Sequence, residues 1–250
     1  MQSVLAATPD SAHSPFSNRR SAAAMHDKTR YLKKSSIFEQ LTDAELAQAQ
    51  AQCQFREFSR GDVIYFPRDS GDDALLVVKG RVRTYHITGD GKQAILGFVD
   101  PGGMFGELSA FNGTARDEYA DAIEKCVIVQ IPRTLLLDLM SQNADVSRKL
   151  TEVFSERVKR VERRLKSLLF GSSRERLFDL LNDLAEQYGV GSPDGVVIAQ
   201  KISHQDMASI IGATRETVTI TLGELQSEGV IEINRRRITI CRKEAVPSVV

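Results

Sequence analysis

The sequence predicts an α+β protein with three parts: an N-terminal β jelly roll, a long helix and a C-terminal winged helix-turn-helix. Three patterns predict this order. Short apolar runs separated by glycines fill residues 52–131, and apolar residues recur every three or four positions over residues 154–168. Beyond residue 202, two short helical segments surround a glycine and are followed by two alternating strands.

The first part consists of short apolar or alternating runs, which are typical of half-buried strands. These runs are VIYF, ALLVV, RVRTYHI, AILGFV and VIVQI. Glycines at positions 61, 71, 80, 89, 91, 102 and 103 lie at or near the expected turns. Regular short strands with glycine turns favour a β sandwich or jelly roll.

The long helix carries apolar residues spaced 4-3-4-3, which is the spacing of a heptad seam. The seam consists of Phe154, Val158, Val161, Leu165 and Leu168, and charged residues fill the positions between them, as in ERVKRVERRLK. The alternative is an amphipathic helix that packs on its own domain. The length of the seam favours pairing with the same helix of a second subunit, which makes a homodimer.

A pair of capped helices is predicted after residue 202. Ser203 and Thr214 are placed to cap the two helices, and Gly212 suits the left-handed turn between them. One apolar stripe per helix would enter the core, consisting of Met207, Ile210 and Ile211 in the first helix and Val218, Leu222 and Leu225 in the second. VIEI and RITI then alternate as the two strands of a wing. The sequence therefore predicts a winged helix-turn-helix.

Polar residues lie off the buried stripe of the second helix, at Arg215, Glu216 and Thr219. Arg235–Arg237 form a basic run on the wing, where DNA phosphates would lie. Residues 171–250 as a whole hold nine basic and eleven acidic residues, a net charge of −2. DNA binding is therefore expected to depend on local positive groups and helix N-termini and to be very sensitive to salt. A two-fold dimer would place two recognition helices roughly 34 Å apart, one DNA turn, and so bind a palindromic site.

The composition argues against several other classes of protein. The chain has 250 residues and a net charge of zero, and no apolar run approaches the length of a membrane span. Residues 1–24 lack the apolar core of a signal peptide. The three cysteines, Cys53, Cys126 and Cys241, form no CxxC pair, and the four histidines are too scattered for the metal site of a jelly-roll dioxygenase. We expect a cytoplasmic protein that is not an enzyme and holds no metal or cofactor.

Four motifs together resemble the Crp/Fnr family of bacterial transcription regulators. They are IIGATRETVT, PGGMFGEL, RGDVIYF and the RLFDLL helix, and the resemblance covers roughly residues 30–243. It implies a cyclic-nucleotide-binding jelly roll, a dimerisation helix and a winged helix-turn-helix. It further implies binding of double-stranded DNA at a two-fold symmetric promoter site and contact with RNA polymerase. The predicted divisions are a disordered tail at 1–29, a sensor domain at 30–140, the dimerisation helix at 141–170, the DNA-binding domain at 171–244 and a tail at 245–250.

The resemblance also assigns roles on the DNA-binding surface. Arg215 and Glu216 match base-contacting positions, and their chemistry agrees, because arginine can bind guanine O6 and N7 while a carboxylate can accept from the cytosine amino group. Gln205 and Thr214 match phosphate-contacting positions. Ile220 departs from the second base-contacting arginine of cyclic-AMP-binding members and suits a thymine methyl instead. The full predicted DNA-binding set is Gln205, Thr214, Arg215, Glu216, Thr217, Thr219, Ile220, Arg235 and Arg236.

The expected effector pocket matches the family pattern only in part. Gly106, Glu107, Leu108 and Arg116 match the cassette in which members of the family hold the phosphate and ribose of cyclic AMP. Asp117 and Glu118 stand where small residues are expected, and Val161 and Glu162 replace the polar pair that contacts adenine. Because these two carboxylates would repel the phosphate of cyclic AMP, we expect no control by cyclic AMP. We expect Arg116 to form an ion pair with one of the two acids instead.

Other effectors are weighed on the same basis. The alternative to an effector-independent regulator is one that responds to cyclic AMP or to cyclic di-GMP, for which Arg157, Arg160, Arg163 and Arg164 offer positive charge, although such residues more often form a solvated face. An iron–sulfur cluster would need cysteines in the N-terminal tail, which has none. Haem would need an axial ligand, and His86 stands alone on a strand.

Overall fold

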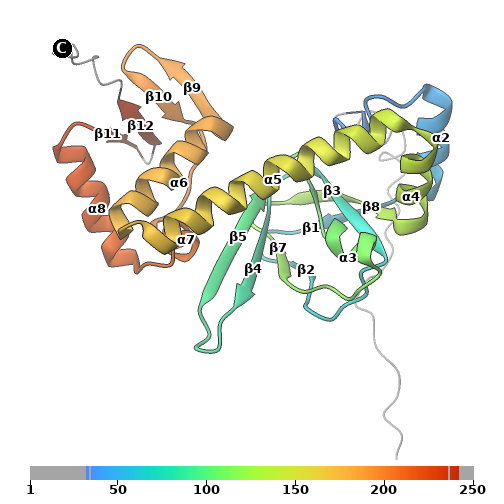
Figure 1. The fold of residues 1–250 in the computed structure, drawn as a ribbon, viewed down its shortest axis with the longest axis horizontal. Coiled ribbons are helices and arrows are strands. Elements are labelled where there is room, and N and C mark those ends of the chain that lie inside the picture. Colours follow the sequence, from blue (N-terminus) through green and yellow to red (C-terminus); the bar gives the residue numbers. More distant parts are fainter. Residues whose placement is uncertain (1–31, 34, 236, 242–250) are drawn as a thin grey trace, which may run out of the picture.

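The computed structural model describes residues 32, 33, 35–235 and 237–241. Two parts are joined by one long helix, α5 (Ala144–Phe170), which runs across the molecule in Figure 1. The N-terminal part contains, in chain order, α2 (Asp43–Gln52), β1 (Gln54–Phe58), β2 (Val63–Tyr65), β3 (Asp73–Lys79), β4 (Val82–Ile87), β5 (Gln93–Val99), β6 (Met104–Phe105), α3 (Glu107–Asn112), β7 (Tyr119–Ala122), β8 (Cys126–Pro132) and α4 (Arg133–Gln142). No helix among the described residues is long and apolar enough to cross a membrane.

Two antiparallel sheets form the jelly roll. Their strand orders are β1-β8-β3-β6 and β2-β7-β4-β5. The side chains between the sheets are apolar and buried, and they include Phe58, Leu75, Val77, Phe105 and Ile128. The alternating runs of the sequence therefore form strands that bury one face in this core, as predicted.

A second apolar cluster covers the outer face of the first sheet. Leu46 of α2, Leu136 of α4 and Leu150 near the start of α5 are all buried in it, together with Leu76 and Val129 of the sheet. The start of α5 is thus part of the core of the N-terminal domain. Phe154 still packs against this core, and beyond it the helix becomes exposed on most of its surface.

The junction between α5 and the C-terminal domain is set by local capping. The helix α5 ends at Phe170, and α6 (Ser173–Tyr188) begins immediately after Ser172. Ser172 accepts a hydrogen bond from the backbone N–H of Glu175 (3.3 Å), while the Glu175 carboxylate accepts from the backbone N–H of Ser172 (2.7 Å). This reciprocal capping box starts a new helix at once and therefore fixes the break between α5 and α6.

The C-terminal domain is a winged helix-turn-helix. It contains α6, β9 (Gly189–Ser192), β10 (Gly195–Ile198), α7 (His204–Ile211), α8 (Arg215–Ser227), β11 (Ile231–Asn234) and β12 (Arg237–Cys241). The strands form one antiparallel sheet in the order β11-β12-β10-β9. Residues 189–195, whose sequence GVGSPDG is typical of a loop, form most of the β9–β10 hairpin. Three glycines in this stretch interrupt the alternation of apolar and polar residues that would indicate strands. β10 is held in the sheet by its pairing with β12.

Candidate functional site

The turn between α7 and α8 follows the predicted capping. The Ser203 hydroxyl accepts from the backbone N–H of Asp206 (3.0 Å), and the Thr214 hydroxyl accepts from that of Thr217 (3.1 Å). Gly212 has φ = +66°, a left-handed conformation that favours glycine. One face of α8 is buried, and it carries Val218, Leu222 and Leu225 together with Thr221. The apolar stripe of this helix therefore faces the core, as predicted.

The opposite side of α8 carries the predicted base-contacting residues. Arg215, Glu216, Thr219 and Ile220 are exposed, and Ile220 keeps 63% of its surface accessible. An exposed isoleucine among polar neighbours is available for an apolar contact with a partner such as a thymine methyl. The structure therefore brings these four residues together on one accessible helix face.

The predicted phosphate-contacting residues lie around that face. Gln205 and Thr214 are exposed at the starts of α7 and α8, whereas Thr217 is half-buried, with its hydroxyl 2.9 Å from that of Thr214. Arg235 is exposed at the tip of the wing between β11 and β12, with φ = +48°. Arg236 lies outside the described residues.

His204 is a further residue of this surface that the sequence analysis did not select. Its Nδ1 lies 2.9 Å from Oγ1 of Thr219. Because the Thr219 hydroxyl donates to the carbonyl of Arg215 (2.9 Å), it accepts from the Nδ1–H of His204. This contact joins the first turn of α7 to the recognition helix across fifteen residues, and no local pattern in the sequence indicates it.

Arg116, one of the predicted effector-pocket residues, has a side chain that is 2% exposed and is bonded to other groups of this chain, while its Nε has no hydrogen-bond partner among the described residues. Its guanidinium donates to the carbonyl of Gly106 and to both the carbonyl (2.6 Å) and the carboxylate of Asp73. It also lies over the ring of Tyr65, 4.8 Å from the ring centroid. Burial raises the pKa of the Asp73 carboxyl and Arg116 opposes that rise.

The expected ion pair between Arg116 and Asp117 or Glu118 is wrong. Asp117 is exposed, and Glu118 accepts a hydrogen bond from the hydroxyl of Tyr65 instead (2.6 Å). The backbone of Arg116 is hydrogen-bonded to that of Arg68 (2.8 Å) and Asp69 (2.9 Å), just before β3, and this places it near Asp73. Gln130 of β8 donates to the other oxygen of Asp73 (2.7 Å). The partner of Arg116 is thus set by a distant segment and not by its neighbours in the sequence.

Glu107 is also held within the protein. Its side chain is 3% exposed and forms an ion pair with Arg157 of α5, which donates in addition to the carbonyl of Met104. Burial raises the pKa of Glu107, while the adjacent guanidinium of Arg157 opposes that rise. Arg157 therefore ties the long helix to the pocket and is not simply part of a solvated face.

The remaining predicted pocket residues differ in burial. Leu108 and Val161 each keep 65% of their surface accessible, and Glu162 is exposed as well. Glu107 and Arg116 are thus the buried polar residues of the predicted set, whereas these three residues lie on accessible surfaces.

Two family models match the chain, in the order of its two domains. Residues 55–143 match the cyclic nucleotide-binding domain, and residues 171–246 match the Crp-like helix-turn-helix domain. The chain is 30% identical over 198 residues to the global nitrogen regulator of Synechococcus elongatus, which covers 78% of this chain and 89% of that protein. This chain belongs to the Crp/Fnr family of transcription regulators.

Two further relatives agree with the assignment of this Crp/Fnr chain. It is 26% identical over 213 residues to the CRP-like cAMP-activated global transcriptional regulator of Mycobacterium tuberculosis, covering 85% of this chain and 95% of that one. A solved structure of a CRP/FNR-family transcriptional regulator from Thermus thermophilus is 30% identical, with a TM-score of 0.58, and the match covers 76% of this chain and 94% of that chain.

The dimerisation seam predicted for this Crp/Fnr protein is mostly exposed in the single chain. Val158, Val161, Leu165 and Leu168 keep 56%, 65%, 53% and 39% of their surfaces accessible. Phe154 differs, because its ring packs edge-on against Phe111 at 5.6 Å between centroids, within the N-terminal domain. The four later residues therefore form an uncovered apolar stripe along the outer half of α5.

Proposed function

We propose that this Crp/Fnr-type DNA-binding regulator acts as a homodimer on palindromic double-stranded DNA and that cyclic AMP does not control it. The observation that carries the second point is the pairing of both polar groups of the pocket. Arg116 is bonded to Asp73 and Gly106, and Glu107 is bonded to Arg157. A cyclic nucleotide would have to displace these partners before it bound.

DNA recognition is proposed to rest on the exposed face of α8. Arg215 would donate to guanine, Glu216 would accept from cytosine, and Ile220 would contact a thymine methyl. The capped N-termini of α7 and α8 and the wing residue Arg235 would hold phosphates. Because positive groups at the interface supply the attraction within a domain of acidic balance, we expect this binding to weaken as the salt concentration rises.

The homodimer is proposed on the apolar stripe of α5. Four large apolar residues at heptad spacing would cover one another in a pair of parallel helices. The two DNA-binding domains would then be related by a two-fold axis, as a palindromic site requires. Contact with RNA polymerase and a cytoplasmic location follow as further proposals from the role of a transcription regulator.

The pocket argument is electrostatic. The phosphate of a cyclic nucleotide needs the charge of Arg116, which Asp73 already neutralises. Displacing Asp73 would leave a carboxylate next to a phosphate, and like charges at such distances repel by several kcal/mol, roughly 4 kcal/mol at 4 Å with an effective dielectric constant of 20. We therefore propose that the internal ion pairs replace the ligand.

A second candidate is the same regulator under the control of cyclic AMP or cyclic di-GMP. One observation favours it: Oε2 of Glu107 is buried and has no hydrogen-bond partner among the described residues. A buried acceptor without a partner is costly, and a ribose hydroxyl would satisfy it.

The test is selection of bound DNA from a random pool, followed by titration of the selected site at fixed salt with and without each cyclic nucleotide. We expect a palindrome with a G·C pair in each half-site and an affinity that neither nucleotide changes more than two-fold. A ten-fold or larger gain with cyclic AMP or cyclic di-GMP would establish the second candidate. Failure to select any shared sequence would contradict the DNA-binding role itself.

A further inference from the structure

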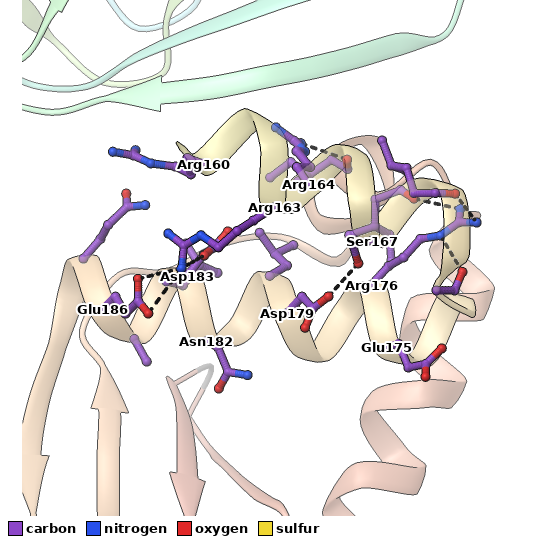
Figure 2. A pocket seen from close by; sticks show the side chains of 18 of the residues that line it. Arg160, Arg163, Arg164, Ser167, Glu175, Arg176, Asp179, Asn182, Asp183 and Glu186 are labelled. Atoms are coloured by element: carbon purple, nitrogen blue, oxygen red, sulfur yellow. Dashed lines mark hydrogen bonds and ion pairs between the residues drawn. The ribbon is translucent and has the colours of Figure 1, made fainter. Parts of the chain in front are cut away.

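Arg164 of α5 joins three backbone carbonyls from two domains. Its guanidinium donates to Leu96 (2.8 Å) and Ile95 (3.0 Å) of β5 and to Ile210 of α7 (2.8 Å). The long helix, the jelly roll and the first helix of the helix-turn-helix thus meet at one side chain. Figure 2 shows Arg164 on α5 with a hydrogen bond to an oxygen, beside a pocket of about 960 Å³ whose lining includes residues of α5, α6, α7 and β5.

The two carbonyls of β5 lie at a bulge on an edge strand. β5 is the last strand of its sheet and, among the residues that the structure describes, pairs with β4 alone. Tyr85 pairs with Ile95 and Thr84 with Gly97, so Leu96 is the extra residue of a β-bulge. A bulge on an edge strand leaves backbone groups without partners in the sheet. Arg164 supplies hydrogen bonds to both of these carbonyls.

The third carbonyl is free because it lies in the last turn of a helix. The final four carbonyls of a helix have no partner within it, and a cation beside them also stabilises the negative end of the helix dipole. Arg176 of α6 approaches the neighbouring carbonyl of Ile211 at 3.5 Å. Arg164 and Arg176 therefore bind the end of α7 from the long helix and from α6. Burial lowers the pKa of Arg164.

A second arginine, Arg83 of the jelly roll, contacts the start of α7. Arg83 of β4 holds Asp121 with two hydrogen bonds (3.0 and 2.6 Å), and its remaining nitrogen lies 3.5 Å from the carboxylate of Asp206 in the first turn of α7. The fork to Asp121 fixes the direction of this guanidinium. Because the contact with Asp206 is long, we expect it to contribute less than the three bonds of Arg164.

We propose that Arg164 is a positioning residue for DNA recognition: it fixes the recognition helix relative to the dimerisation helix and thereby sets the separation of half-sites that the dimer accepts. This rests on the proposed palindrome-binding homodimer. Two of the three bonds hold β5 and the third holds α7, so Arg164 links α7 to the jelly roll, and α8 follows α7 through the short turn at Gly212. A rigidly held pair of recognition helices matches one separation, whereas a loosely held pair matches several.

The experiment measures DNA affinity on a series of palindromes whose half-site separation changes by single base pairs, together with a duplex that holds one half-site. The variants are Arg164→Ala, Arg164→Lys and Arg83→Met, with Lys166→Ala as the control that removes an exposed charge two positions along α5. Arg164→Lys keeps the charge, but one ammonium cannot reproduce the planar fork that reaches three carbonyls. Thermal denaturation checks that each variant is folded.

We expect Arg164→Ala to weaken binding to the best-spaced palindrome at least ten-fold and to flatten the dependence on separation, while binding to the single half-site stays within two-fold of wild type. Arg164→Lys should also flatten the dependence of affinity on half-site separation, and Arg83→Met should flatten it to a smaller extent. Lys166→Ala should keep the wild-type profile. An unchanged profile in Arg164→Ala and Arg164→Lys, or an equal loss on the single half-site, would overturn the positioning role. If the wild-type protein itself shows no preferred separation, the palindrome-binding dimer fails instead.

Discussion

Replacing Arg116 with methionine should destabilise the protein, whether or not a cyclic nucleotide is present. Arg116 donates to two carbonyls and to the carboxylate of Asp73, and its side chain is 2% exposed. Breaking a buried ion pair costs about 3–5 kcal/mol. Because the side chain of Asp73 is 26% exposed and keeps Gln130 as a partner, we expect the lower end, about 3 kcal/mol. For a chain of this size that corresponds to a loss of about 6–12 °C in Tm.

The assay is thermal and urea denaturation of four proteins: wild type, Arg116→Met, Asp73→Asn and the double variant. If the two groups stabilise each other, the double variant should be more stable than the sum of the two single losses predicts, by about 1 kcal/mol or more. Lys125→Met is the matched control, since Lys125 forms an exposed ion pair with Glu57 at 3.3 Å and should cost under about 1 kcal/mol.

Two results would refute this reasoning. One is an Arg116→Met protein whose stability lies within about 1 kcal/mol of wild type, since a buried guanidinium with three partners is expected to cost more than an exposed pair. The other is wild-type protein whose Tm rises steeply with cyclic AMP while that of Arg116→Met does not, because that pattern marks Arg116 as a ligand-binding group.

The other predictions concern DNA, assembly and pH. Arg215→Ala should weaken specific binding by about 1–3 kcal/mol and relax base choice at one position per half-site, measured on single-base variants of the site; unchanged specificity would place the contact elsewhere. Leu165→Glu should shift the dimer to monomer in analytical ultracentrifugation, while the exposed neighbour change Lys166→Glu should not. Because burial raises the pKa of Glu107 above its ordinary 4.5, its contribution to stability is complete below that pH and declines as the pH rises through the raised value. Glu107→Gln should therefore flatten the fall in stability from about pH 4.5 towards neutral, and an unaltered pH profile would contradict this.

The parts of the fold set by local chemistry could be predicted from the sequence. Ser203, Gly212 and Thr214 determine the ends of two helices through contacts within three residues, so their types and spacing suffice. The same holds for the buried stripe of α8 and for the break at Ser172, where the capping box is visible as Ser-x-x-Glu. The β9–β10 hairpin could not be found this way, because its pairing with β12 comes from a strand more than forty residues away.

The polar contacts of the site depend on distant segments, and the sequence does not show them. Asp73 reaches Arg116 across 43 positions, and Arg157 reaches Glu107 across 50. The neighbouring acids Asp117 and Glu118 were the natural candidates for Arg116, but the chain directs one to solvent and the other to Tyr65. Arg164 was less predictable still, since its partners are backbone carbonyls, which any residue supplies.

The continuity of α5 constrains its length as well as its side chains. The helix has 27 residues with no proline or glycine among them, and it connects the core around Leu150 to the carbonyls held by Arg164. One inserted residue would turn everything beyond it by about 100° and advance it by about 1.5 Å. Such an insertion between Leu150 and Arg164 would carry Arg164 and the apolar stripe to a different side of the molecule. An insertion or deletion in this part of the helix should therefore disrupt the structure more than most substitutions there.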